Sequence, residues 1–233
     1  MLRRLEPALG GLLLLVASLS LVAAACGGGE ETPSPTPSPV PPEMKDQLKQ
    51  MVLQADDLPA GFEPVDEAFS TNEESAASAD DPQGHLADLE RWGRILGYEV
   101  TYESSAPAVS GQTMLFSVYS TVSIYQSNEG ASASLADAVA VARTTDWPVR
   151  FAGAENVEMK EVPISGLADE ASWLRITEKG NTGEQVFAFD IVMLRQGPGR
   201  GMLQVGSFGT EESEKMVEQL ARAQVDRMRS ALG

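Results

Sequence analysis

The spacing of hydrophobic positions after residue 43 predicts helices and strands in a regular order. Leu48, Met51 and Val52 recur at helical spacing, so we expect a helix over 44–55 that ends at Asp56-Asp57-Leu58-Pro59. Strand patterns follow over 95–103 and 112–125. The second strand places four apolar residues on one face: Phe116, Val118, Val122 and Ile124.

Helical spacing returns over 128–143, with Ser127 or Asn128 as N-cap. Its apolar stripe consists of Ala131, Leu135, Ala138, Val139 and Ala142. Strands are then predicted over 171–177, 185–195 and 202–208, with an edge strand over 156–163. Thr210 is expected to cap a last helix, whose inward stripe is Val217, Leu220, Ala221, Val225 and Met228.

Short turns at 180–183 and 197–199 join neighbouring strands, and such turns connect antiparallel strands. The fold class is therefore α+β, with a curved antiparallel sheet packed by helices. The element order repeats, which suggests two strand-strand-strand-helix halves. In that arrangement each helix would cover the part of the sheet formed by its own half. The repeat lies in element order alone, so an independent origin of the two halves stays open.

The N-terminus has the pattern of an export signal. Arg3 and Arg4 precede an apolar run over 8–25, and Ala23-Ala24-Ala25 stand directly before Cys26. This segment resembles the lipobox of bacterial lipoproteins, although a lipobox usually has leucine where this chain has Ala23. The resemblance implies that residues 1–25 are a cleaved signal peptide and that Cys26 carries the lipid.

Two other interpretations of this segment stay open. Ala23 and Ala25 also suit ordinary signal peptidase, which would release a secreted protein. An uncleaved membrane helix is the third, because about 18 apolar residues approach the length that spans a bilayer. Lipidation is favoured because Cys26 is the only cysteine, so the chain can form no internal disulfide.

The predicted organisation has three parts. Residues 26–43 form a lipidated tether, since the stretch TPSPTPSPVPP has little to bury and its prolines exclude helix and central strand. Residues 44–233 form one extracytoplasmic domain, which is long enough to fold without metal, disulfide or nucleotide. We expect the protein to be anchored on the outer face of the bacterial cell membrane through Cys26.

The charge of the chain argues against several partners. It has 17 basic and 34 acidic residues, and without Arg3, Arg4 and Glu6 it has 15 and 33, a net charge of about −18. Phosphate backbones and anionic lipid repel so acidic a domain, so no nucleic acid is expected. Much of the acid lies over 66–81, which shows neither periodicity and is predicted to be a solvated loop rather than a calcium site.

The element order, the opening Leu58-Pro59-Ala60-Gly61-Phe62 and the turn Gly166-Leu167-Ala168-Asp169-Glu170-Ala171 resemble sensor-type extracellular lipoprotein domains with a PsbP-like fold. The resemblance covers about two-thirds of the chain. It implies a curved antiparallel sheet packed by helices, and a role in binding or assembly rather than catalysis.

Catalytic and metal motifs are absent from the sequence. His85 is the only histidine, and its polar surroundings before Leu86 and Leu89 predict a solvated surface residue rather than a general base. The chain has no GxSxG, HExxH, phosphate loop or dinucleotide fingerprint. With one histidine and one cysteine, zinc is disfavoured. We therefore predict no enzyme, no catalytic or metal residues and no cofactor.

Two sets of residues are candidates for a site. Asp190 shares a strand face with Val192 and Leu194, and would need a partner such as Arg175 if that face were buried. The favoured interpretation is the reverse, in which Phe187, Phe189, Ile191 and Met193 face the core and Asp190 faces water. Five aromatic residues could floor a groove, although strand spacing more often indicates core: Trp92, Tyr98, Tyr102, Trp147 and Trp173.

Three functional hypotheses follow. The favoured one is a non-enzymatic ligand-binding or sensor module for a small apolar ligand or a partner protein. A structural or assembly lipoprotein that docks a partner protein is the alternative, and it would show an exposed apolar patch. A hydrolase that uses two carboxylates in a cleft is the third. The ligand-binding residues are unknown from the sequence.

Overall fold

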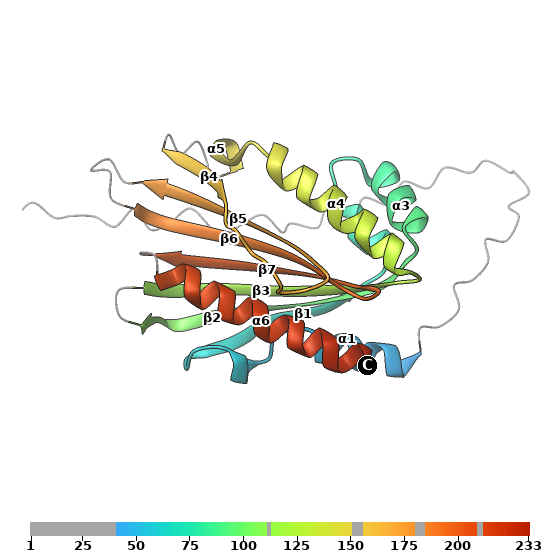
Figure 1. Cartoon of the computed structure of the whole chain (residues 1–233), viewed down its shortest axis with the longest axis horizontal. Coiled ribbons are helices and arrows are strands. Elements are labelled where there is room, and N and C mark those ends of the chain that lie inside the picture. Colours follow the sequence, from blue (N-terminus) through green and yellow to red (C-terminus); the bar gives the residue numbers. More distant parts are fainter. Residues whose placement is uncertain (1–40, 111–112, 151–155, 180–184, 209–211) are drawn as a thin grey trace, which may run out of the picture. The chain divides into compact units, whose positions relative to one another are not determined.

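Seven antiparallel strands form one open sheet, in the order β1-β2-β3-β7-β6-β5-β4 (Figure 1). The structure is a computed structural model that describes residues 41–110, 113–150, 156–179, 185–208 and 212–233. Cys26, the predicted signal peptide and nearly all of the predicted tether lie outside these residues, as do the predicted turn at 180–183 and the predicted cap Thr210. The α+β class predicted from the sequence is confirmed.

The strands are β1 (Phe62–Ser70), β2 (Arg94–Ser110), β3 (Thr113–Tyr125), β4 (Val157–Glu161), β5 (Glu170–Lys179), β6 (Gln185–Gln196) and β7 (Gly199–Phe208). The helices are α1 (Pro42–Met51), α2 (Asn72–Ala77), α3 (Pro82–Arg91), α4 (Asn128–Thr144), α5 (Trp147–Arg150) and α6 (Glu212–Leu232), with a short 3₁₀ turn at Ala55–Asp57. Ser127 is the N-cap of α4, and its side chain accepts a hydrogen bond from the Gly130 N–H.

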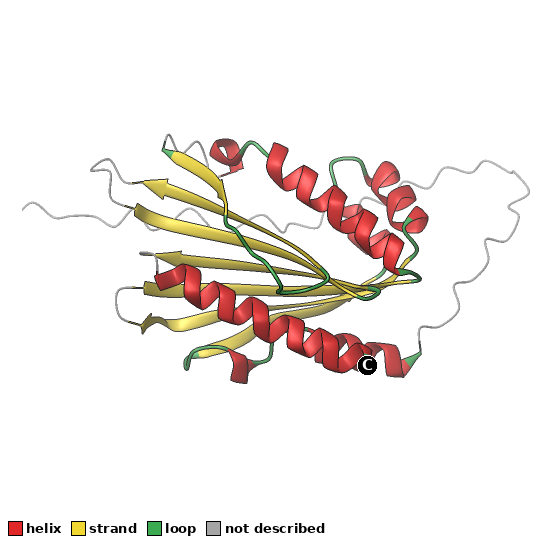
Figure 2. Ribbon diagram, in the orientation of Figure 1, coloured by secondary structure: helices red, strands yellow, loops and turns green. Residues whose placement is uncertain are grey.

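The long helix α6 and the N-terminal helix α1 cover one face of the sheet (Figures 1 and 2). The predicted stripe of α6 is buried throughout. It packs against strand residues such as Val118, Val192 and Leu203, and α1 adds Leu48 and Met51 to the same core. We call this side of the sheet the α6 face.

The helix α4 packs on the opposite side of the sheet, which we call the α4 face (Figure 2). Its Leu135 and Val139 contact Ile191 and Met193 of β6, whose neighbours Val192 and Leu194 point to the α6 face. The helix crosses mainly β6 and β7, which belong to the second half of the chain. The prediction that each helix covers its own half is therefore wrong.

The positions of α4 and α6 also test whether the two halves of the chain are copies of one unit. β3 of the first half pairs antiparallel with β7 of the second, through partners such as Val118 and Val205. A rotation that exchanges two antiparallel neighbours is perpendicular to the sheet and keeps each face on its own side. A true repeat would place α4 and α6 on one face, whereas they lie on opposite faces. The two halves share an element order but not an arrangement.

Two predictions for individual segments are also wrong. The acidic stretch over 66–81 forms the end of β1, then α2, and ends at Asp81, the N-cap of α3, with a capping box between Thr71 and Glu74. β1 is an edge strand exposed on both sides, so its sequence shows no alternation. Phe116 does not share the face of Val118, because the register shifts between Leu115 and Ser117.

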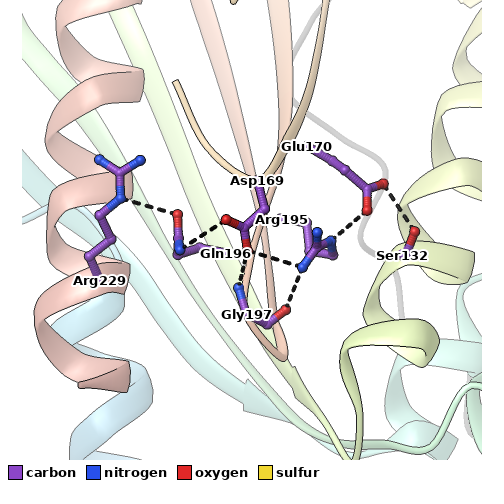
Figure 3. A network of polar contacts seen from close by, with 7 residues as sticks. All are labelled: Ser132, Asp169, Glu170, Arg195, Gln196, Gly197 and Arg229. Carbon is purple, nitrogen blue, oxygen red and sulfur yellow. Dashed lines mark hydrogen bonds and ion pairs between the residues drawn. The ribbon is translucent and has the colours of Figure 1, made fainter. Parts of the chain in front are cut away.

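The turn before β5 fastens both long helices to the β6–β7 hairpin (Figure 3). Asp169 accepts hydrogen bonds from the Gly197 N–H at 2.8 Å and from Arg195 at 3.1 Å. Glu170 accepts one from Arg195 at 2.7 Å and another from Ser132 of α4 at 3.0 Å. The acidic pair in this turn therefore has a structural role.

On the other side of the turn, Arg229 of α6 donates a hydrogen bond to the Leu167 carbonyl at 2.9 Å. It also donates one to Gln196 at the end of β6 (Figure 3). The Leu167 side chain is buried in the core of the α6 face. The turn is thus bound to α4 through Ser132 and to α6 through Arg229.

Because Leu220 is 3% exposed in the core of the α6 face, Leu220→Ala should lower the free energy of unfolding by about 2–5 kcal/mol in one cooperative transition. Urea denaturation followed by circular dichroism measures this. Arg222→Ala, an exposed change on the same helix, should cost well under about 1 kcal/mol. A separate melt of the C-terminal half would contradict a single shared core.

Candidate binding cleft

A cleft of about 570 Å³ lies on the α4 face, where α4 does not cover the sheet. Its floor is formed by β2, β3, β6 and β7. One wall is α4 with the segment that follows it, and the other is the α2–α3 region. The volume falls within the range of sites that take up small organic molecules.

The floor consists of side chains in register across neighbouring strands. In the first row, Ser123 of β3 lies between Gly97 of β2 and Arg200 of β7. In the next row, Thr121 lies between Glu99 and Met202. Met193 of β6 follows Met202, so this second row changes from polar over β2 and β3 to apolar over β7 and β6.

Arg94 stands at the polar end of this floor and is 7% exposed. Its guanidinium donates to Ser123 Oγ at 3.0 Å and to Ser70 Oγ at 2.7 Å. It also donates to the Thr71 carbonyl and to Asn72 Oδ1, both at 3.1 Å. All four acceptors are uncharged. Burial lowers the pKa of Arg94, and the positive charge of Arg200 adds to this effect.

Gly97 makes room for the Arg94 guanidinium. A Cβ at this position would lie 2.1 Å from Arg94 Nη2 and 2.8 Å from Ser70 Oγ. Any larger residue would therefore displace the arginine from the sheet. The glycine and the arginine form one structural unit at the polar end of the floor.

Arg200 lies across β3 from Arg94 and is only partly bonded. Its Nη1 donates to Ser134 Oγ of α4 at 3.1 Å, and Ser134 is also 2.6 Å from the Tyr125 hydroxyl. Its Nε is buried and has no hydrogen-bond partner among the described residues. The Arg200 guanidinium is therefore less fully bonded than that of Arg94.

A carboxylate also lies on the floor. The Tyr119 hydroxyl donates to Glu99 Oε2 at 2.5 Å, and both residues line the cleft. Burial, followed by the Glu99 carboxylate, raises the pKa of Tyr119. Tyr119 therefore remains a neutral hydroxyl that holds Glu99 in place.

The five aromatic residues predicted to floor a groove lie on two different faces of the sheet. Trp92 and Trp147 line the cleft, where Trp147 Nε1 donates to the Ala142 carbonyl at 3.0 Å. Tyr98, Tyr102 and Trp173 lie on the α6 face and belong to its core. His85, predicted to be a solvated surface residue, is half-buried and lines the cleft, because α3 packs over the first strands. No pairing of His85 with a nucleophile appears among the described hydrogen bonds.

Asp190 is fully buried on the α6 face, so the favoured prediction that it faces water is wrong. Both faces of β6 are covered by helices, and hydrophobicity alone does not tell which face is buried. The Trp173 indole donates to Asp190 Oδ1 at 2.7 Å, and Arg175 Nη2 lies 3.4 Å from Oδ2. Burial, which outweighs the Arg175 charge, raises the pKa of Asp190 to about 6.

The Arg175 guanidinium extends this buried network to the start of α6. It donates to Ser213, and its Nη1 lies 2.8 Å from Glu214 Oε1. Burial alone would raise the pKa of Glu214, but hydrogen bonds from Lys160 and Arg175 outweigh it and lower this pKa. The predicted pair of Arg175 and Asp190 therefore exists, on the face opposite the cleft, where it fixes α6 to the sheet.

Within the described residues, no three side chains of the metal-ligating types His, Cys, Asp and Glu lie together as a candidate metal site. The helices in the same residues include none that is long and apolar enough to span a membrane.

Comparison with known proteins shows a likeness at the level of fold. No protein-family model matches the chain, and no curated protein matches it. Among solved structures, the chain is similar to the extracellular domain of PknH from Mycobacterium tuberculosis, with a TM-score of 0.51 and 11% identity. The match covers 83% of this chain and 98% of that domain. At this identity the likeness supports the fold alone.

Sequence reasoning did not find Arg94, Arg200 or the row of Ser123, Thr121 and Tyr119 as a site. The available signal was the second face of β3, which is polar along a strand whose other face is core. A central strand with one polar face indicates a face that helices do not fully cover.

The raised pKa of Asp190 leads to a prediction about pH. Between about pH 4 and 6 the folded state binds the Asp190 proton more tightly than the unfolded chain, so this group lowers stability as the pH rises through that window. Asp190→Asn cannot titrate. The stability of wild type relative to this variant should fall by up to about 3 kcal/mol from pH 4 to pH 7.

Urea denaturation of both proteins at several pH values measures this difference. Glu214 titrates in both proteins, so the comparison largely removes its contribution. A difference that stays constant or grows with pH would show that Asp190 is charged throughout and that Arg175 outweighs its burial.

Proposed function

We propose that this chain is a membrane-anchored extracytoplasmic lipoprotein whose domain is a non-enzymatic ligand-binding or sensor module. The cleft on the α4 face is the observation that supports this function most directly. The lipobox-like segment before Cys26 supports the location. The fold likeness to an extracellular domain is consistent with it.

The cleft has the properties of a small-molecule site. Its floor is rigid sheet, and its two walls come from separate helical segments. Arg200 has N–H groups without a hydrogen-bond partner among the described residues. Glu99 and Tyr119 add polar groups at fixed positions. A concave site with a few convergent polar groups beside apolar side chains is the usual form of a ligand site.

Binding is favoured over hydrolysis by the way these groups are engaged. Glu99 accepts the Tyr119 hydroxyl, and Ser134 is bonded to Tyr125 and Arg200 rather than to a base. A hydrolase would need an acid and a base or nucleophile that act on one bond. The groups described here instead hold a fixed arrangement of donors and acceptors.

An assembly role is the second candidate, and an aromatic cluster on the α4 face supports it. The Phe116, Phe187 and Phe208 rings lie with centroids 5.0–6.1 Å apart. Phe208 is 39% exposed. Phe116 and Phe187 are half-buried beside it. Aromatic residues that gather at one partly exposed place are typical of protein interfaces.

The anchor is tested at Cys26. Wild type should enter the membrane fraction and incorporate labelled fatty acid, whereas Cys26→Ser should do neither, because the net charge of −17 disfavours binding to an anionic membrane surface. Equal membrane retention of the variant would indicate an uncleaved helix. Full secretion of wild type would indicate ordinary signal peptidase cleavage.

The ligand site is tested by filling the cleft. Ala138 of α4 lines it, so Ala138→Trp should abolish retention of a small molecule that native mass spectrometry detects on the purified wild type. Ala140→Trp is the matched control, because Ala140 is exposed on the same helix. Loss of the ligand from both variants, or from neither, would place the binding site elsewhere. A wild type that carries no small molecule but captures a protein partner would favour the assembly role.

A further inference from the structure

We propose that the cleft binds an amphiphilic oxyanion, a small molecule with a carboxylate or phosphate group that lies between Arg94 and Arg200 and an apolar chain that lies under α4. This inference rests on the proposed function, because it assigns a ligand class to the same cleft. It departs from the apolar ligand expected from the sequence.

The distribution of arginine charges is the first argument. Across the part of the chain that the structure describes, every arginine outside the cleft makes an ion pair with a carboxylate. The arginines without such a pair within the same residues are Arg94, Arg150 and Arg200, and all three line the cleft. In a chain of net charge −17, three arginines without a carboxylate partner therefore gather in one cleft, although Glu99, Asp80 and Asp137 also line it.

The geometry of the floor is the second argument. Ser123 is the cross-strand partner of Arg200, and its hydroxyl accepts from Arg94 Nε at 3.0 Å. Cross-strand partners have Cβ atoms about 5 Å apart, so the two guanidinium groups flank one serine on adjacent strands. Arg94 already uses four of its five N–H groups and has one left. Arg200 uses one, to Ser134, so its guanidinium can offer two N–H bonds to an oxyanion such as a carboxylate or a phosphate.

The unsatisfied donor is the third argument. Arg94 is held by four uncharged acceptors and keeps its full charge. Arg200 has one bond, to Ser134, and its buried Nε has no partner among the described residues. The terminal N–H groups of Arg200 that do not bond Ser134 have no partner among the described residues, so an oxyanion in the cleft can accept from them and supply the negative charge that both guanidinium groups lack.

The Glu99 carboxylate offsets part of the positive charge that Arg94 and Arg200 place on the floor. Among the cleft-lining residues of the two rows nearest the arginines it is the one carboxylate, and it accepts a hydrogen bond from the Tyr119 hydroxyl. Two guanidinium groups against one carboxylate leave a positive floor. Asp80, in the loop between α2 and α3, and Asp137 of α4 also line the cleft, so an anion is favoured at the arginine end of the floor rather than along these walls.

The apolar part of the ligand follows from the other half of the floor. Beyond Thr121 the same row continues through Met202 and Met193, and Ile191 and Trp147 also line this side. Methionine side chains adapt to flexible hydrocarbon. The polar and apolar ends of the floor therefore match a molecule with one charged end and one apolar end.

The test uses calorimetric titration of the mature chain, residues 26–233, with Cys26→Ser to remove acyl groups. Octanoate and octyl phosphate are the probes, with octanol as the neutral control and inorganic phosphate as the control without a chain. Both amphiphilic anions should bind at least tenfold more tightly than octanol or inorganic phosphate. Arg200→Gln should weaken octanoate binding tenfold or more, and Arg222→Gln should stay within twofold of wild type. Arg200→Lys, which keeps the charge but not the paired donors, should be intermediate.

Equal binding of octanol and octanoate, with no effect of Arg200→Gln, would show that the cleft does not recognise an oxyanion. Equal binding of inorganic phosphate and octyl phosphate would show that the apolar chain does not contribute to binding. If Ala138→Trp removes a neutral co-purified molecule, the assignment of an oxyanion ligand is wrong, whereas the ligand-binding function is supported. If Arg200→Gln fails to fold by circular dichroism, Arg200→Lys decides, and unchanged affinity in that variant counts against paired recognition.

Discussion

The ladder between β3 and β7 is the interaction on which the rest of the structure depends. It joins the first and second halves of the chain into one sheet, through pairs such as Val118 with Val205. Both strands are central, with one face in the core under α6 and the other face only partly covered. The helix after β3 packs on one face and the helix after β7 on the other. This placement, rather than a repeated unit, sets the two-sided arrangement of the domain.

The two faces are covered unequally. On the α6 face, α6 and α1 bury a continuous core, and the buried pair of Arg175 and Asp190 fixes the start of α6. On the α4 face, α4 lies over β6 and β7 while α2 and α3 cover the first strands at one end. The cleft is the part of the sheet between them. A binding site therefore arises where the helices are too few to cover the sheet.

Much of the fold was predictable from periodicity, and the site was not. The stripes of α4 and α6 followed from helical spacing because one face of each is buried and the other is solvated. β1 has no such contrast, since it is an edge strand exposed on both sides. Asp190 was misplaced because both faces of β6 are buried. Arg94 and Arg200 are over a hundred positions apart, and only the β3–β7 pairing brings them to one serine.

The central claim is that the uncovered floor of the α4 face binds an oxyanion through Arg94 and Arg200. The most direct measurement is the set of arginine Nε–H resonances in ¹H–¹⁵N spectra of residues 26–233 with Cys26→Ser during a titration with octanoate. The account predicts that the Arg200 and Arg94 resonances shift and saturate together, because the anion lies between them. The resonance of Arg222, exposed on α6, should not move. Shifts confined to Arg222 and other exposed arginines outside the cleft, or no shifts at all, would contradict it.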